Sequence, residues 1–416
     1  MRDQDFWNTF TQLHWAQQAT RLESDFTPPN TSIEDFFRWV VLAPQKRFFR
    51  GSDLVQEESF FPTLADRSFE QYHQRILQLL PETEYSLVVG GLETTDSDLW
   101  KWVVQTLTPL HQIVGSPAGF SEISAFIGNY SNTPFGVHQD RSGVLAMPLI
   151  GTKRMRLWPR EYGLAHPDID HSHQYEAFTP DSFLLEATPG QALYWPSEAW
   201  HVAEGDGSLS VSWSIGFWDA LPVRILYEAT HEIVRLALEE EGSVLSSLLL
   251  EDKDLVSDPP LPLPDSLPKV QCRLASVLRD HLFTSPRIQH YLQTESLRRE
   301  TSLGFCPVPL QETQSETTED PLLQTDPRFP IQTLEIREEH LLVSALGHVI
   351  ETVAHPNILY ILERLSANQP IPRQSLIQCQ TPFPHEWPTS STPSPEDVAN
   401  LLDFLEKIHA IQKVCL

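Results

Sequence analysis

Short apolar runs broken by Gly and Pro fill the middle of the chain, and they limit the fold more than any other feature of the sequence. The runs typical of strands lie within residues 120–218, at 121–127, 136–140, 143–150, 153–158, 192–195 and 209–217. Several short strands with turn signals between them are typical of a β-sandwich or β-barrel. We therefore expect such a fold to form the core of this region.

Two histidines and one aspartate in this region have the residue types and the spacing of a metal site. His138 and Asp140 lie two residues apart in a strand candidate, so their side chains leave the same face of the strand. His201 follows 61 residues after Asp140. Two imidazoles and one carboxylate on one face of a metal leave coordination positions open, as non-haem Fe(II) oxygenases require. An HxD pair alone is weak evidence in a chain with 16 His and 56 acidic residues, so its surroundings decide the assignment.

A lysine follows the HxD pair in the next strand candidate. Alternation along 153–158 places Lys153 on one face with Met155 and Leu157. An ammonium on an inward, apolar face needs an anionic partner, because an unpaired buried charge is costly. The distal carboxylate of 2-oxoglutarate is a suitable partner. The alternative is a lysine on an edge strand whose ammonium reaches water along apolar surface.

The last strand candidate of the region alternates between serines and large apolar residues. Val211, Trp213 and Ile215 oppose Ser212 and Ser214. The apolar face is expected to pack on the core. The serine face meets either water or a polar cavity, and the sequence leaves both interpretations open.

The charge of the chain bears on its partners. A formal net charge of −27, from 56 acidic and 29 basic residues, disfavours binding to phosphate backbones and to anionic lipid. We therefore expect no direct nucleic-acid partner and no membrane partner, whereas a basic protein or peptide would be attracted.

Cysteine usage and the N-terminus bear on location. Four scattered cysteines without a CxxC pair indicate neither a disulfide framework nor a zinc knuckle. The N-terminus lacks the layout of a signal peptide, and no apolar run approaches membrane-spanning length. A cytoplasmic location is therefore expected.

Three segments of the region resemble the JmjC-like cupins, a family that includes the ribosomal oxygenases and the asparaginyl hydroxylase that inhibits hypoxia-inducible factor. The segment NTPFGVHQD (132–140) is similar to the family's first metal strand, and GTKRMRLWP (151–159) to the strand whose basic residue binds 2-oxoglutarate. The segment PGQALYWPSEAWH (189–201) is similar to the turn and strand that carry the last metal ligand. The segments have the family's order, and Lys153 lies thirteen residues after Asp140, as the family pattern expects.

The resemblance implies an Fe(II)- and 2-oxoglutarate-dependent dioxygenase, with O2 as co-substrate, that hydroxylates a side chain of a protein or peptide. Demethylation is a variant of the same chemistry. The resemblance implies that His138, Asp140 and His201 bind the iron and form the catalytic centre, and that Lys153 binds 2-oxoglutarate.

Two further positions depart from the family pattern. Ser212 lies where some members have an asparagine near the cofactor, and Phe135 lies where the family has a threonine that contacts the cofactor. Thr133 is the nearest threonine to that position. Ser212 and Thr133 are therefore the further candidates for cofactor binding.

The expected fold class is α+β: a double-stranded β-helix (the cupin or JmjC-like jelly roll) with an N-terminal α/β elaboration, a helical segment and a C-terminal winged-helix-like module. The ribosomal oxygenases have a dimerisation segment and a winged-helix module in the same order. We expect a cupin oxygenase domain at 1–221 with its core at 120–218, a helical segment for homodimerisation at 222–306, a linker at 307–327 and the winged-helix-like domain at 328–416.

Several alternatives stay open. The chain is equally interpretable as a peptide-modifying oxygenase of natural-product (ribosomal peptide) maturation, whose recognition modules are also winged-helix-like. Two other interpretations remain. One is a non-catalytic metal-binding cupin scaffold, and the other is a cupin isomerase or sugar-modifying enzyme, which would not need Lys153. Tyr130, Arg141 and Trp200 flank the ligands and are candidates for the substrate mouth, although a tryptophan such as Trp200 is more often simply a core residue. The cluster His166, Asp168, Asp170, His171 and His173 is expected to be a surface loop.

Overall fold

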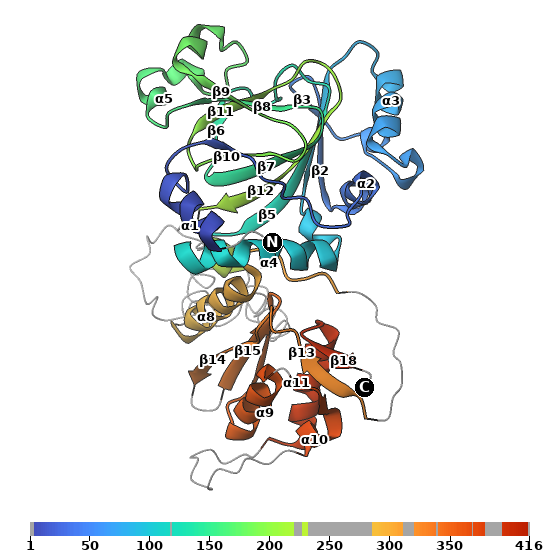
Figure 1. Ribbon diagram of the computed structural model, residues 1–416, viewed down its shortest axis with the longest axis vertical. Helices are drawn as coiled ribbons and strands as arrows, with labels where there is room; N and C mark the ends of the chain where they lie inside the picture. Colours follow the sequence, from blue (N-terminus) through green and yellow to red (C-terminus); the bar gives the residue numbers. More distant parts are fainter. Residues whose placement is uncertain are drawn as a thin grey trace, which may run out of the picture.

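The computed structural model describes residues 4–116, 119–219, 227–231, 285–310, 320–337, 340–367, 369–378 and 393–414. The fold is α+β, with an N-terminal body built on two antiparallel sheets and a C-terminal body with two three-stranded sheets (Figure 1). Helical periodicity of the sequence at 223–250 and 270–282 underlies the helical segment expected at 222–306. Most of that segment lies outside the described residues, and homodimerisation stays a prediction.

Two facing sheets form the N-terminal body. The larger has eight strands in the order β1-β10-β7-β12-β5-β4-β2-β3, and the smaller has the order β6-β11-β8-β9. All neighbouring strands are antiparallel, and residues of both sheets line one cavity, as in the jelly roll of a cupin. The strands are β1 (Thr20–Leu22), β2 (Gln45–Arg50), β3 (Asp53–Val55), β4 (Tyr85–Gly90), β5 (Ser121–Gly128), β6 (His138–Gln139), β7 (Ser142–Ile150), β8 (Lys153–Trp158), β9 (Phe183–Ala187), β10 (Ala192–Trp195), β11 (Trp200–Glu204) and β12 (Ser210–Trp218).

The predicted strands agree with the structure where side chains alternate clearly. The candidates at 121–127, 143–150, 153–158, 192–195 and 209–217 correspond to β5, β7, β8, β10 and β12 within one residue at each end. The candidate at 136–140 shortens to β6, because Gly136 lies in a turn with a φ of +66°. The strand β9 was not predicted, since its apolar residues Phe183, Leu184 and Leu185 are consecutive and do not alternate.

Helices cover the face of the larger sheet that lies away from the cavity. The helices α2 and α4 contribute Phe36 and Trp102, whose rings lie 5.4 Å and 6.2 Å from the Trp213 ring of β12. A capping box begins α2, as its sequence predicts: the Asp35 N–H donates to Ser32 Oγ and the Ser32 N–H donates to the Asp35 carboxylate. The helices of this body are α1 (Gln4–Leu13), α2 (Ile33–Leu42), α3 (Phe69–Leu79), α4 (Ser97–Val114) and α5 (Tyr162–Ala165).

The C-terminal body differs from the prediction at its start. The expected linker at 307–327 includes β13, which lies in the centre of the sheet β17-β13-β18 and therefore belongs to the domain. β13 and the C-terminal strand are far apart in the sequence, so the sequence did not show that these two strands pair. The elements are α8 (Ser285–Ser302), β13 (Leu322–Thr325), β14 (Gln332–Arg337), β15 (His340–Ala345), β16 (His348–Val353), α9 (Pro356–Ser366), β17 (Ile371–Pro372), α10 (Arg373–Ile377), α11 (Pro395–Lys407) and β18 (Ile411–Val414).

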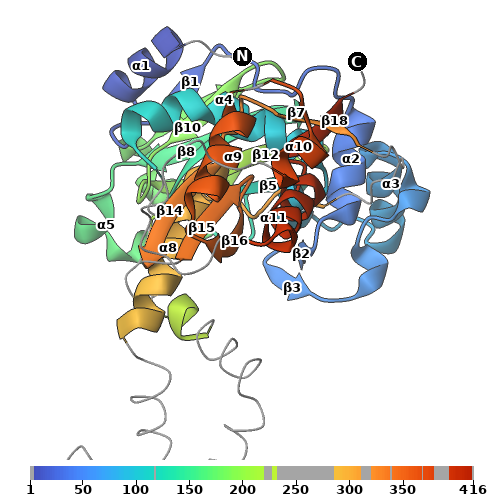
Figure 2. The same cartoon turned by 90° about the horizontal axis from the view of Figure 1, so that it is seen from below.

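The hairpin and helices expected in this body are present. The apolar pattern of the sequence predicts a strand–turn–strand at 341–353 and helices at 357–365 and 395–408. The structure has β15 and β16 around Gly347, and α9 and α11, at these places. Figure 2 shows α9, α10 and α11 grouped beside the strands of this body. A winged-helix assignment stays a prediction.

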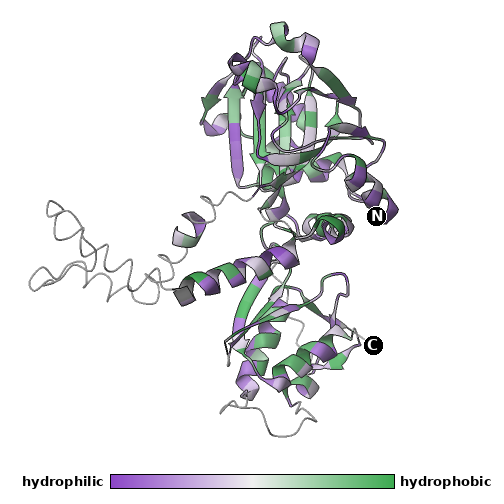
Figure 3. Ribbon diagram, turned by 90° about the vertical axis from the view of Figure 1, so that its left-hand side faces the viewer, coloured by the Kyte–Doolittle hydropathy of each residue, from purple (hydrophilic) through white to green (hydrophobic). Residues whose placement is uncertain are grey.

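Residues 303–308 join the two bodies. The Trp100 indole N–H donates to the Cys306 carbonyl at 2.7 Å, and the Ser121 hydroxyl donates to the Leu303 carbonyl at 2.8 Å. Phe305 and Val308 are buried in the same hydrophobic cluster as the residues of α4. Figure 3 shows α4 between the two bodies, with hydrophobic residues along the strands of the upper body and on the helices of the lower one. The joint therefore lies behind the large sheet, away from the cavity.

In the described parts of the chain, no helix combines the length and the apolar character needed to cross a bilayer.

Glu93 is a buried carboxyl behind the large sheet. It lies in the 3-10 helix Leu92–Thr94, is 2% exposed, and accepts a hydrogen bond of 2.9 Å from the Ile123 N–H of β5. Burial raises the pKa of Glu93 to about 7, and the nearby Glu122 carboxylate acts in the same direction. The native state therefore holds a proton on Glu93 in a pH range where an unfolded glutamate has lost it.

We predict that Glu93→Gln removes a pH dependence of stability. Between the ordinary pKa of 4.5 and about 7, the native state binds more protons than the unfolded state, so the free energy of unfolding falls as pH rises. The fall is on the order of 3 kcal/mol across this window. Urea unfolding at pH 5 and pH 7.5 should show a smaller fall for Glu93→Gln than for the unaltered protein, whereas the exposed Glu161→Gln should change nothing. Equal slopes for all three proteins would contradict the assignment.

Candidate metal and cofactor site

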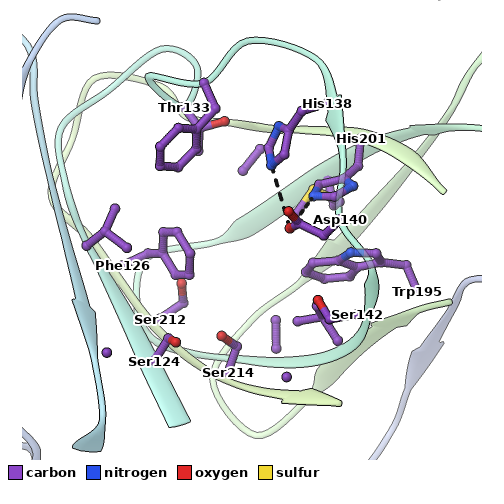
Figure 4. A pocket seen from close by; sticks show the side chains of 18 of the residues that line it. Ser124, Phe126, Thr133, His138, Asp140, Ser142, Trp195, His201, Ser212 and Ser214 are labelled. Atoms are coloured by element: carbon purple, nitrogen blue, oxygen red, sulfur yellow. Dashed lines mark ion pairs between the residues drawn. The ribbon is translucent and has the colours of Figure 1, made fainter. Parts of the chain in front are cut away.

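One cavity of about 390 Å³ lies between the two sheets, within the size range of small-molecule sites. Its walls come from β2, β4, β5, β7 and β12 of the larger sheet and from β6, β8 and β11 of the smaller one. Figure 4 shows His138, Asp140 and His201 together at one side of the cavity, with Ser212 and Ser214 across from them.

The two histidines and the aspartate meet because of strand register. His138 of β6 pairs directly with His201 of β11, and Asp140 follows the end of β6. The Asp140 Oδ2 atom lies 3.7 Å from His138 Nε2 and 3.5 Å from His201 Nε2. Among the residues that the structure describes, this is the one group of three or more His, Cys, Asp or Glu that is arranged to hold a metal.

Backbone carbonyls orient both imidazoles. His138 Nδ1 lies 3.0 Å from the Gly136 carbonyl, and His201 Nδ1 lies 2.9 Å from the Ala199 carbonyl. A carbonyl only accepts hydrogen bonds, so each Nδ1 carries the proton and each Nε2 keeps a lone pair. Both lone pairs belong to the nitrogens nearest Asp140, which is the second-shell arrangement of metal-binding histidines.

The three groups fit a small divalent cation. Two ligand atoms each about 2.1 Å from one ion lie at most about 4.2 Å apart, and the two distances to Asp140 satisfy this limit. Burial alone would raise the pKa of the Asp140 carboxyl, but hydrogen bonds and charge from His138 and His201 in their protonated forms hold that pKa well below its usual range, so Asp140 stays an ionised ligand. Burial lowers the pKa of His201, which favours the neutral form that binds metal.

A tight turn before β6 depends on Gly136. The Gly136 N–H donates to the Thr133 carbonyl, and φ is +66°. A Cβ atom at this position would lie 2.7 Å from the His171 carbonyl oxygen and 2.8 Å from the Ser172 carbonyl oxygen. The backbone of the loop 159–182 therefore lies directly against the turn, and only glycine fits between them.

The loop 159–182 is closer to the site than the sequence suggested. The His171 N–H donates to the Val137 carbonyl at 2.7 Å, the Val137 N–H donates to the Ser172 carbonyl, and His171 lines the cavity. His171 is exposed, as expected of a surface loop, and it also borders the cavity. The remaining members of that cluster, His166, Asp168, Asp170 and His173, are absent from the described lining of the cavity.

Lys153 faces the cavity from β8, on the inner face with Met155. The residue is 4% exposed, and its ammonium lies 5.0 Å from the centre of the Phe126 ring. No carboxylate of the described residues lies within 4.0 Å of this ammonium, so its one described partner is an aromatic face. The edge-strand alternative, with the ammonium in water, does not hold.

The serine face of β12 also lines the cavity. Ser212 and Ser214 are 1% and 6% exposed and belong to the cavity wall, while Val211, Trp213 and Ile215 pack behind the sheet. Thr133 is a buried wall residue too, and its hydroxyl has no hydrogen-bond partner among the described residues. The serine face of β12 therefore lines a polar cavity and does not face bulk water.

Some wall residues were missed, and some expected ones lie elsewhere. Trp200 is a core residue, as the alternative interpretation of it predicted, and Tyr130 is buried in a hydrophobic cluster as well. Arg141 is exposed, and none of the three belongs to the described lining of the cavity. Glu122 and Ser124 of β5 do line it. Their alternation with Ile123 and Ala125 indicates that Glu122 and Ser124 lie on the same face of β5. Only the pairing of β5 with β12 shows that this face lines the cavity.

Comparison with known proteins identifies one family in the chain. Residues 105–221 match the JmjC domain. A crystal structure of the Escherichia coli ribosomal oxygenase YcfD is 15% identical over 98% of this chain and 98% of that one, with a TM-score of 0.51. A structure of YcfD in complex with cobalt and 2-oxoglutarate is 16% identical, covering 98% and 97%, with a TM-score of 0.50. No curated protein sequence matches the chain.

We predict that Gly136→Ala damages the metal site and Gly190→Ala does not. Both glycines have positive φ, but a Cβ at Gly190 meets nothing within 4 Å, whereas at Gly136 it meets two carbonyl oxygens. Gly190→Ala should lose about 1 kcal/mol of stability from backbone strain, and Gly136→Ala should lose more, because its Cβ also collides with the two carbonyl oxygens. Gly136→Ala should in addition weaken Mn(II) binding, measured by electron paramagnetic resonance of free Mn(II). Equal Mn(II) affinity in both variants would show that the turn does not position His138.

Proposed function

We propose, from the JmjC domain at residues 105–221, that the protein is an Fe(II)- and 2-oxoglutarate-dependent dioxygenase that hydroxylates a side chain of a protein or peptide. One observation carries the proposal: a facial group of two imidazoles and a carboxylate shares its cavity with a buried ammonium that no described carboxylate neutralises. This chemistry needs a metal, a keto acid that binds to the metal, and a basic side chain that binds the keto acid.

His138, Asp140 and His201 would hold the iron. Bound there, Fe(II) would supply activation of O2 coupled to oxidative decarboxylation of 2-oxoglutarate. The chain's own part is to present two neutral Nε2 atoms and an ionised carboxylate, with the imidazoles fixed by the Gly136 and Ala199 carbonyls. The walls bury His201 more deeply than Asp140, whose side chain is 36% exposed, so charge interactions are strengthened most at the His201 side of the group.

Lys153 would bind the carboxylate of 2-oxoglutarate that lies away from the metal. A buried ammonium that has only a ring face as partner gains most from an anion, because the cost of its desolvation is then offset. Thr133 and Ser212 would add hydroxyl donors in the same cavity. Thr133 would thus contact the cofactor in place of the threonine that the family has at the position of Phe135.

The substrate would be a basic protein or peptide, and the setting a cytoplasmic one. The structural neighbour YcfD is described as a ribosomal oxygenase, and a net charge of −27 attracts basic partners while it repels nucleic acid. We propose the same order of domains as before, with the C-terminal domain beginning at β13 instead of at 328. Its winged-helix character and the dimerisation of the helical segment belong to this proposal.

The first test is anaerobic binding of 2-oxoglutarate with Mn(II) in place of iron. A ligand at about a hundred times its Kd adds about 2.7 kcal/mol of apparent stability, which a thermal shift detects. His138→Ala should abolish the shift by removing the metal, and Lys153→Ala should abolish it while Mn(II) still binds. Arg154→Ala, on the opposite face of the same strand and paired with Glu186, is the matched control and should keep the shift. Mn(II) binding without any response to 2-oxoglutarate in the unaltered protein would refute the proposal and favour a scaffold.

The second test concerns Thr133. Its hydroxyl is buried without a partner, so Thr133→Val should stabilise the free protein by about 1 kcal/mol. The same change should weaken 2-oxoglutarate binding about tenfold, because a donor to a carboxylate is lost. Thr106→Val is the matched control: its hydroxyl is also buried and unpartnered, but it lies on α4 outside the cavity. Unchanged 2-oxoglutarate affinity in Thr133→Val would remove Thr133 from the cofactor site.

A further inference from the structure

The short turn 196–199 connects β10 to β11 and lies directly before His201. The Ala199 N–H donates to the Pro196 carbonyl at 3.4 Å, and the Ala199 carbonyl accepts from His201 Nδ1 at 2.9 Å. The orientation of the Ala199 carbonyl therefore sets both the tautomer and the direction of the His201 ring. Any contact that holds this turn in place also positions the third candidate ligand of the metal.

Glu198 has a strained backbone conformation in this turn. Its φ is +64°, in the left-handed region that is unfavourable for residues with a Cβ atom and that glycine adopts most readily. A residue keeps such a conformation only where the surrounding structure holds it there. The contacts of Glu198 therefore show what holds the turn.

Three contacts hold Glu198. Its N–H donates to the Asp140 carbonyl at 2.8 Å, and its carbonyl accepts from the Gln139 side-chain amide at 2.5 Å. Its carboxylate lies 2.5 Å from the guanidinium of Arg160, which is mostly exposed, so this ion pair contributes little. Gln139 and Asp140 belong to the segment that carries the first two candidate ligands. The turn before the third ligand is thus tied directly to that segment.

The Gln139 amide reaches two backbone carbonyls. Its Nε2 atom lies 2.5 Å from the Glu198 carbonyl oxygen and 3.4 Å from the Arg160 carbonyl oxygen. An amide nitrogen carries two N–H donors, so one NH2 group serves both carbonyls. The Trp200 indole N–H also donates to the Arg160 carbonyl, at 3.2 Å. The amide therefore joins the turn 196–199 to the beginning of the loop 159–182.

Strand register explains why this bond matters for the metal group. β6 and β11 pair through two residue pairs only, Gln139 with Trp200 and His138 with His201. So short a ladder fixes the two strands weakly. The Gln139 side chain extends the connection to residue 198, two residues before Trp200, and so adds a third point of attachment between the two strands that carry the imidazoles.

We propose that Gln139 is a positioning residue of the metal centre: its side-chain amide holds the strained Glu198 peptide and thereby sets the direction of the His201 imidazole. The proposal deepens the proposed function and rests on it, because it requires that the three candidate ligands bind a metal. Gln139 acts through His201 and is not itself a ligand. Without the amide, the Glu198 peptide relaxes toward a less strained φ, and the Ala199 carbonyl rotates away from the imidazole.

The first measurement compares Gln139→Met with the matched control Gln191→Met. Methionine has about the size of glutamine but no N–H donor. Gln191 also holds a turn through its side chain, which accepts from the Thr188 N–H at 3.0 Å and donates to the Glu23 carboxylate at 2.7 Å. Electron paramagnetic resonance of free Mn(II) gives the affinity. We expect Mn(II) to bind about tenfold to a hundredfold more weakly in Gln139→Met, the effect of losing a second-shell partner, and to bind normally in Gln191→Met.

Proton NMR of the protein saturated with Co(II) separates positioning of His201 from a general loss of stability. Co(II) shifts the exchangeable Nδ1–H signals of the histidines that bind it far from the other signals. The unaltered protein should show two such signals, one for each imidazole. Gln139→Met should shift one of them or broaden it through exchange with water, because the bond to Ala199 is disturbed. The other, whose proton is donated to the Gly136 carbonyl, should stay unchanged.

A double variant tests the role of strain. Glycine adopts a positive φ freely, so Glu198→Gly should let the turn keep its form without the amide. Gln139→Met combined with Glu198→Gly should therefore bind Mn(II) more tightly than Gln139→Met alone.

Equal Mn(II) affinity of Gln139→Met and the unaltered protein would overturn the proposal. Weaker binding with both Nδ1–H signals unchanged, or without recovery in the double variant, would do the same. Failure of the unaltered protein to bind Mn(II) and Co(II) would instead refute the proposed function, because the three candidate ligands would then hold no metal. The two failures are thereby distinguished.

Discussion

The pairing of His138 with His201 between β6 and β11 is the contact on which the site depends. β6 has two residues and cannot hold its own position, whereas β11 pairs with β8 along all five of its residues. β8 in turn begins with Lys153. The metal group and the basic anchor therefore share one small sheet, and their relative position follows from hydrogen-bonded register. A slip of one residue in β11 would turn His201 out of the cavity and Trp200 into it.

The larger sheet supplies the opposite wall of the cavity, and helices pack against its rear face. Trp213 and Ile215 of β12 are fully buried against the helices, which leaves Ser212 and Ser214 no alternative but the cavity side. The apolar face provides the stabilising burial, so the cavity face is free to carry small and polar residues. The joint at 303–308 binds this same rear face through Trp100 and Ser121. Attachment of the C-terminal body therefore leaves the cavity wall unobstructed.

Alternation within single strands is the part of this structure that the sequence predicted well. It placed Lys153 inward with Met155, and it separated the serine face of β12 from the tryptophan face. Alternation did not predict which strands lie side by side. Gln45 and Glu122 are 77 residues apart, and only the order β12-β5-β4-β2 brings them together over Gly90. The same reason explains β13, whose partners β17 and β18 follow it in the sequence by dozens of residues. The segment 159–182 is a surface segment as expected, but its approach to the site is made by backbone hydrogen bonds, which side-chain types do not reveal.

The cavity is electrostatically unbalanced as the chain alone forms it. A buried ammonium has a ring face in place of a counter-ion, a buried threonine hydroxyl lacks a partner, and four serine hydroxyls are available. Each of these costs stability in the free protein, and each is relieved by an anion that carries hydrogen-bond acceptors. The free energy withheld from folding is thereby available for binding an anion at the Lys153 end of the cavity.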